Sequence, residues 1–133
     1  MEDWLGVLHD SKATHALYGR SVPDLRNVIL HEVAFHADGN RVQLRFDLAE
    51  LPQQRPAEWA IRGLDTVQVE LHLVGIREAV ITGWSHLVAV DLSLNAHDGT
   101  IVCDSSGDSH IHVVAEHALI SRVSVYERIG DDR

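Results

Sequence analysis

The 133-residue sequence contains one cysteine, Cys103, so no disulfide can form within the chain. Because disulfides are rare in the reducing cytosol, a chain without them fits a cytoplasmic protein. The N-terminal stretch MEDWLGVLHD is acidic and lacks the basic start and apolar centre of a signal peptide. No apolar run approaches the ~20 residues that cross a bilayer. We expect Cys103 to be a small core residue and not a reactive thiol.

Basic residues are also scarce. The sequence has 11 lysines and arginines against 20 aspartates and glutamates, a formal net charge of -9. Direct binding of nucleic acid needs a basic surface, so this balance argues against it. An acidic surface commonly serves solubility, and it also speeds association with a basic protein partner. Composition alone leaves both interpretations open.

The sequence motifs of common enzymes are absent. There is no Gly-rich phosphate loop, no Cys-x-x-Cys, no His-Glu-x-x-His and no Gly-x-Ser-x-Gly. We therefore expect no catalytic residue and no cofactor.

Histidine is the exception, with ten residues. On a strand, His110, His112 and Glu116 would share one face, and two imidazoles with a carboxylate can hold a divalent metal ion. Their spacing resembles the first metal motif of cupins, His-x-His-x-x-x-Glu. Asp104 stands where that motif begins with glycine, and the later Pro-x-Gly and further histidine are missing. We expect no bound metal. A small metal-dependent enzyme or ligand-binding domain that uses these three residues is the alternative function.

Alternation of apolar and polar residues dominates the remaining sequence. It is clearest over residues 41–48 and 66–74, where it has the period of a strand with one buried face. Further strands are expected over residues 28–36, 79–84, 86–95, 100–104, 109–116 and 119–128. With about eight strands and short turns, such as Asp38-Gly39, we expect a single domain over residues 1–133. Its fold would be mainly β, either an antiparallel β-sandwich or a strongly coiled sheet.

Two other segments complete this prediction. A helix is expected over residues 10–18, where Asp10 or Ser11 can cap a stretch without helix breakers. The connector 50–65 contains two prolines, which cannot donate to a sheet ladder, so it leaves the sheet and returns. We expect Trp59 to fold this connector back onto the core and Trp84 to close the core elsewhere. The alternative is that both tryptophans form an aromatic ligand platform.

The order of these features resembles a known family. A strand precedes Leu-Pro-x-x-x-Pro-x-x-Trp at residues 51–59, which is followed by Val-Gln-Val-Glu-Leu at 67–71 and by Gly83-Trp84. Upstream stand Trp4, Leu17-Tyr18-Gly19 and Pro23. From Trp4 to about Tyr126, this pattern resembles the immunity protein 50 family of bacterial polymorphic-toxin systems. The resemblance implies a cytoplasmic protein without enzymatic activity that binds a cognate toxin and neutralises it by occlusion.

A basic toxin would be steered toward an acidic surface. If the central strands are neighbours, their polar faces would gather Asp47, Glu70, His72 and Asp91, with Glu50 in the connector, and we expect the partner to bind there. Loops and a sheet edge are the alternatives. We expect a monomer or a weak homodimer. A module that oligomerises through a sheet edge is a third functional hypothesis.

Overall fold

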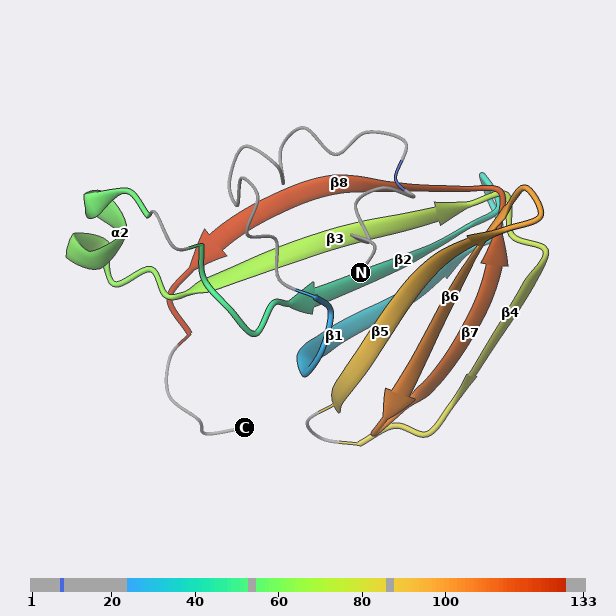
Figure 1. The fold of residues 1–133 in the computed structure, drawn as a ribbon, viewed down its shortest axis with the longest axis horizontal. Coiled ribbons are helices and arrows are strands. Elements are labelled where there is room, and N and C mark those ends of the chain that lie inside the picture. The colour runs from blue at the N-terminus through green and yellow to red at the C-terminus, as the bar shows by residue number, and fades with distance from the viewer. Residues whose placement is uncertain (1–7, 9–23, 53–54, 86–87, 129–133) are drawn as a thin grey trace.

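The computed structural model describes residues 8, 24–52, 55–85 and 88–128 (Figure 1). Its elements are β1 (Val28–His36), β2 (Arg41–Asp47), α2 (Ala57–Arg62), β3 (Thr66–Val74), β4 (Glu78–Thr82), β5 (Val88–His97), β6 (Thr100–Gly107), β7 (His110–Ala115) and β8 (His117–Tyr126). The helix expected over residues 10–18 lies outside the described residues. The mainly β fold is confirmed. All eight strands form one antiparallel sheet in the order β4-β7-β6-β5-β1-β2-β3-β8.

The two ends of this sheet are halves of one bent ribbon. Residues 66–82, which form β3 and β4, pair with residues 110–126, which form β7 and β8. At the bend, the amide of Glu116 donates to the carbonyls of Val74 and Gly75. One ribbon therefore supplies both the β3–β8 end and the β4–β7 end of the strand order, and the sheet must coil to accommodate it (Figure 1). The coiled sheet, and not the sandwich, is the architecture.

Gly75 makes the bend sterically feasible. Its φ is +74°, and a Cβ atom placed there would lie 2.9 Å from Oε1 of Glu116. Glycine reaches such a backbone conformation without steric cost.

The strands alternate between an inner and an outer face. The inner residues of all the strands pack into a single cluster, which includes Leu44, Phe46, Val69, Leu71 and Val113. They lie on the inside of the coil, where apolar side chains leave water, at a gain of about 25 cal/mol per Å² of apolar area buried. Cys103 belongs to this cluster and is fully buried, as predicted, and burial raises the pKa of its thiol to about 12. The opposite, outer face consists mainly of polar residues.

The connector leaves the sheet as predicted, but it also forms the short helix α2, which the prediction missed. α2 follows Pro56 and ends at Gly63, whose left-handed conformation lets its amide donate to the carbonyl of Ala60. Trp59 is half-buried against the core, as expected for the residue that folds the connector back. None of the helices in the described parts of the chain is long and apolar enough to cross a membrane.

The prediction that Trp84 closes the core is wrong, because its side chain is 56% exposed. β4 ends at Thr82, and Gly83 with its φ of +84° turns the chain out of the strand before Trp84. Trp59 and Trp84 therefore form no common platform, since α2 and the end of β4 lie at different ends of the molecule (Figure 1).

Candidate functional site

Two adjacent strands carry three of the residues that the sequence suggested for partner binding. On the outer face, Asp47 of β2 lies opposite Gln68 of β3, and Glu70 and His72 follow along β3. Asp91 lies on β5, which β1 separates from β2. Glu50 is exposed in the connector beyond β2. The structure thus brings together Asp47, Glu70 and His72, and it places Asp91 on another part of the sheet.

Asp47 is 1% exposed, so its carboxylate lies beneath the surface. Its Oδ2 atom accepts hydrogen bonds from Nη2 of Arg128 at 2.6 Å and from the hydroxyl of Tyr126 at 2.5 Å, and it lies 2.7 Å from Nε2 of His31. Its Oδ1 atom accepts a bond of 3.0 Å from Nε2 of Gln68. A buried carboxylate is tolerated when both oxygens are bonded in this way.

These bonds control the pKa of Asp47. Burial alone raises the pKa, but the hydrogen bonds from His31, Tyr126, Gln68 and Arg128 together outweigh burial, and the pKa lies below its ordinary value. Asp47 is therefore a charged internal junction between β1, β2, β3 and the end of β8. A partner would reach it only through the side chains that cover it.

The outer face around this junction is balanced in charge. Strands β1, β2, β3 and β8 contain three carboxylates, Glu32, Asp47 and Glu70, and three arginines, Arg41, Arg45 and Arg122, and Arg128 follows β8. Nε of Arg45 lies 3.3 Å from Glu32, and Nε of Arg122 lies 3.8 Å from Glu70. Burial and the nearby Arg41 lower the pKa of His72, so it is neutral at neutral pH. The acidic surface expected here is divided into ion pairs.

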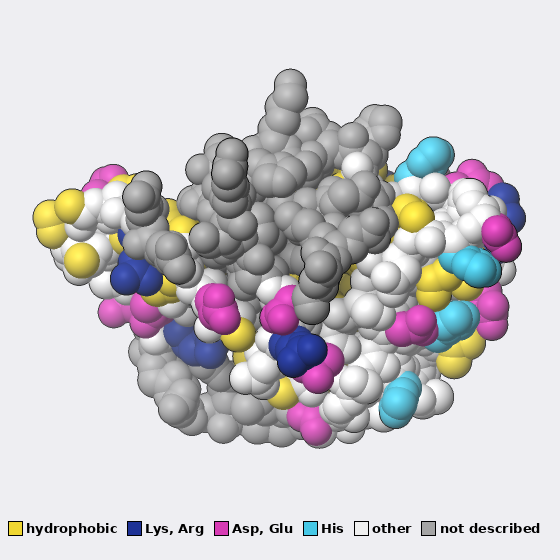
Figure 2. All heavy atoms as spheres, viewed as in Figure 1, with side chains coloured by type: hydrophobic (Ala, Val, Ile, Leu, Met, Phe, Trp, Pro, Cys, Tyr) yellow, Lys and Arg dark blue, Asp and Glu magenta, His cyan; other side chains and the backbone are white. Residues whose placement is uncertain are grey.

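The acidic charge lies on the other half of the sheet. No lysine or arginine occurs between Glu78 and Ser121, a stretch that includes β4, β5, β6 and β7. The same stretch contains six carboxylates, Glu78, Asp91, Asp98, Asp104, Asp108 and Glu116. Figure 2 shows acidic and histidine side chains interspersed with apolar ones at the end of the molecule where β4, β6 and β7 lie, at the right of the view. We call the outer side of these four strands the acidic face.

One row of paired residues crosses the acidic face from edge to centre. Val80 of β4 lies opposite His112 of β7, His112 lies opposite Asp104 of β6, and Asp104 lies opposite Ser93 of β5. Nδ1 of His112 is 2.6 Å from Oδ1 of Asp104, and its Nε2 is 3.7 Å from Oε1 of Glu78. The hydrogen bond to Asp104 is the main reason that the pKa of His112 is raised.

The three residues of the metal alternative do not converge. His110 is exposed opposite Thr82, His112 is bonded to Asp104, and Glu116 lies at the ribbon bend with Nη2 of Arg77 3.4 Å away. Among the described residues, no group of three or more histidine, cysteine or acidic side chains is arranged to hold a metal ion.

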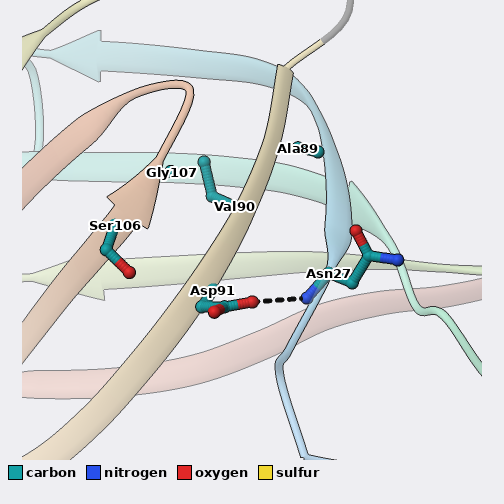
Figure 3. A pocket seen from close by; sticks show the side chains of 6 residues that line it. All are labelled: Asn27, Ala89, Val90, Asp91, Ser106 and Gly107. Carbon is teal, nitrogen blue, oxygen red and sulfur yellow. Dashed lines mark hydrogen bonds between the residues drawn. The ribbon is translucent and has the colours of Figure 1, made fainter.

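Two surface hollows lined by described residues are smaller than a typical metabolite pocket. One, of about 80 Å³, lies between β5, β6 and the segment before β1. There the backbone N–H of Asn27 donates a hydrogen bond of 2.8 Å to Oδ1 of Asp91 (Figure 3). Another, of about 210 Å³, lies beside the Asp47 junction and is lined partly by Asp65, Thr66 and Arg128. Pockets for small molecules usually have about 300–1,000 Å³.

The model of the family described as immunity protein 50 matches residues 10–126. The chain belongs to the immunity protein 50 family. This result confirms the resemblance seen in the sequence. No curated protein and no solved structure matches the chain.

For this immunity protein 50 family member, sequence reasoning missed the residues that surround Asp47. His31 faces Asp47 because a register shift between Leu30 and Glu32 lets two residues of β1 occupy the place of one. Tyr126 and Arg128 approach from 79 and 81 positions further along the chain, which no local pattern reveals. The acidic face could have been found from the long stretch without lysine or arginine.

Proposed function

We propose that this chain binds and neutralises a cognate bacterial toxin domain by covering the surface that the toxin needs for its activity. Membership of an immunity protein family supports a role in binding and not in catalysis.

The one-sided distribution of charge is the observation that best supports a basic toxin. All of the charged side chains between Glu78 and Ser121 are acidic, apart from histidines, and the four strands β4, β7, β6 and β5 of this stretch are neighbours in the sheet. Opposite fields on two proteins accelerate their encounter and disfavour partners of the same sign. Opposite charges would let the chain capture its toxin rapidly, and we keep the expectation that it acts as a cytoplasmic monomer or weak homodimer.

Of the predicted contact residues, Glu50, Glu70, His72 and Asp91 keep some exposure, and we retain them as candidate contacts. Asp47 would act indirectly by holding Arg128 and Tyr126 in place. Glu70 has weaker support than Asp91, because Arg122 offsets the charge of the Glu70 carboxylate, whereas Asp91 accepts a hydrogen bond from the neutral backbone amide of Asn27.

The test is protection of cells. A candidate toxin domain, taken from a gene that lies next to this one, is expressed in a bacterial host with and without the chain, and survival is measured. We expect survival only in the presence of the chain, and a stable complex with a catalytically inactive toxin in size-exclusion chromatography. Death of the cells despite abundant soluble chain, together with separate elution of the two proteins, would show that this toxin is not neutralised by it.

A further inference from the structure

The outer edge of β4 is open to a partner. β4 is the first strand in the sheet order, and no other strand in the described parts of the chain pairs with its outward edge. Val80 on its outer face is 48% exposed, and Trp84 just beyond its end is 56% exposed. An unpaired edge beside exposed apolar side chains is a common site for docking of another protein.

The opposite edge strand, β8, also has no strand pairing with its outward edge in the described parts of the chain, but it has no large apolar side chain as exposed as Val80 or Trp84. Its pairing with β3 is interrupted by a register shift at Ser121, and the exposed Arg122 stands beside that shift. Bulges and charged side chains are the usual means by which edge strands avoid pairing with another chain. In β4 the only charged residue is Glu78. The two edges of the same sheet thus differ in their capacity to accept a partner.

The surroundings of β4 specify the charge of that partner. Behind Val80, the row of paired residues leads to His112 and Asp104, and no lysine or arginine lies on β4, β5, β6 or β7. Glu78 is more than half exposed on the outer face of β4 itself. Nucleic acid would be repelled here, whereas a protein with lysines and arginines around an apolar contact would be attracted.

We propose that the toxin docks along β4 and the adjoining acidic face. Trp84 and Val80 form the apolar centre of this interface, and Glu78, Asp104 and Asp91 form its acidic rim. Tryptophan is among the residues that most often dominate the binding free energy of protein interfaces, while rim charges act mainly on the rate of association. This docking site rests on the proposed function, because it takes the basic partner to be the toxin.

Two substitutions in the apolar centre test the site with the intact chain and the inactive toxin. Trp84→Ala removes the largest exposed contact, and Val80→Lys places a cation on the open edge. We expect each substitution to raise the dissociation constant by about 30-fold or more, which is the effect of losing an interface hot spot. The matched control is Phe35→Lys, because Phe35 is an apolar residue of the other half of the sheet with similar exposure, 54%. We expect Phe35→Lys to bind like the parent.

A charge reversal tests the acidic rim through kinetics. Glu78→Lys should slow association at low salt, and the difference from the parent should shrink as salt rises. Glu32→Lys is the control, because Glu32 is a half-exposed carboxylate of β1 on the balanced half of the sheet. Thermal unfolding followed by circular dichroism establishes that each variant is folded.

The outcomes separate the two proposals. If the parent chain binds the toxin and the β4 variants bind it equally well, the docking site is wrong while the proposed function stands. Loss of binding in Phe35→Lys or Glu32→Lys, with the β4 variants unaffected, would place the interface on the other half of the sheet. If the folded parent chain does not bind this toxin, both proposals are wrong.

Discussion

Nη2 of Arg128 lies 2.6 Å from Oδ2 of Asp47, although 81 positions separate the two residues in the chain. This ion pair fastens the segment after β8 to the end of β2 across β3. Tyr126 donates to the same oxygen, so the edge strand β8 is held by side chains in addition to its backbone ladder. The cluster lies at the end of the ribbon opposite its bend. There the end of β2, the start of β3 and the end of β8 lie side by side.

Asp47→Ala should lower the free energy of unfolding by about 3–5 kcal/mol, the usual cost of removing one partner from a buried ion pair. Arg128 and Tyr126 would lose their acceptor, and Gln68 would lose its own. Urea denaturation measures the change. Asp24→Ala is the control, because Asp24 is exposed and should change stability by less than about 0.5 kcal/mol. A similarly small effect of Asp47→Ala would contradict a stabilising role for the junction.

The same junction predicts a pH dependence of stability. Hydrogen bonding lowers the pKa of Asp47 in the folded state. The ionised carboxylate therefore contributes to the free energy of unfolding, and this contribution is present above the unfolded-state pKa of ~3.9. It is lost as the pH falls through the lower pKa of the folded protein. Asp47→Asn should therefore be less stable than the parent at pH 6, with the difference shrinking toward pH 2. A difference in free energy of unfolding that stays constant from pH 6 to pH 2 would refute the prediction.

His112 should contribute a pH dependence of the opposite sign. The hydrogen bond to Asp104 raises the pKa of His112. Its contribution to the free energy of unfolding is therefore complete below the unfolded-state pKa of ~6.5, and it is lost as the pH rises through the folded-state pKa. His112→Gln should flatten the stability profile in this interval, by a small amount because the side chain is 42% exposed and solvent screens its pair with Asp104. Thermal melts from pH 5 to pH 8 provide the measurement. His110→Gln is the control, and an equal flattening in that variant would assign the effect to another source.

The two tryptophans should respond differently to truncation. Trp59 is half-buried against the core, so Trp59→Ala should cost about 1–3 kcal/mol, below the value for a fully buried tryptophan. Trp84 is mostly exposed, so Trp84→Ala should change the free energy of unfolding by less than about 0.5 kcal/mol. Guanidinium unfolding followed by circular dichroism compares them. A large loss of stability in Trp84→Ala would mean that this side chain packs into the core in solution.

Gly107 should tolerate no side chain. Its φ is +117°, and a Cβ atom there would lie 2.7 Å from the carbonyl oxygen of Ala89 on the neighbouring strand (Figure 3). Gly107→Ala combines backbone strain with a clash against backbone, and it should cost more than the ~1–3 kcal/mol of strain alone. Gly99→Ala is the matched control, since Gly99 has a φ of +80° but nothing within 4 Å of the added carbon. Equal losses in both variants would argue against the close approach of β5 and β6 at Gly107.

The sequence by itself determined the local features of this protein. Strand positions followed from apolar alternation, because a strand with one buried face must repeat with a period of two. β1 and β3 have the predicted bounds, and Cys103 is buried as expected. The family was also recognisable from spaced prolines, glycines and tryptophans. The helix α2 was missed because its six residues are too few to display a helical period, and two prolines precede it.

Tertiary structure alone decided how these strands meet. Alternation assigns a residue to a face, but it does not say which strands are neighbours, because pairing depends on contacts between distant parts of the chain. Asp47 was therefore predicted as an exposed contact, whereas the register of β1 and the return of β8 bury it under His31, Tyr126 and Arg128. Strand order likewise put Glu70 among arginines, and it assembled Glu78, Asp91 and Asp104 into one acidic face beside the open edge of β4.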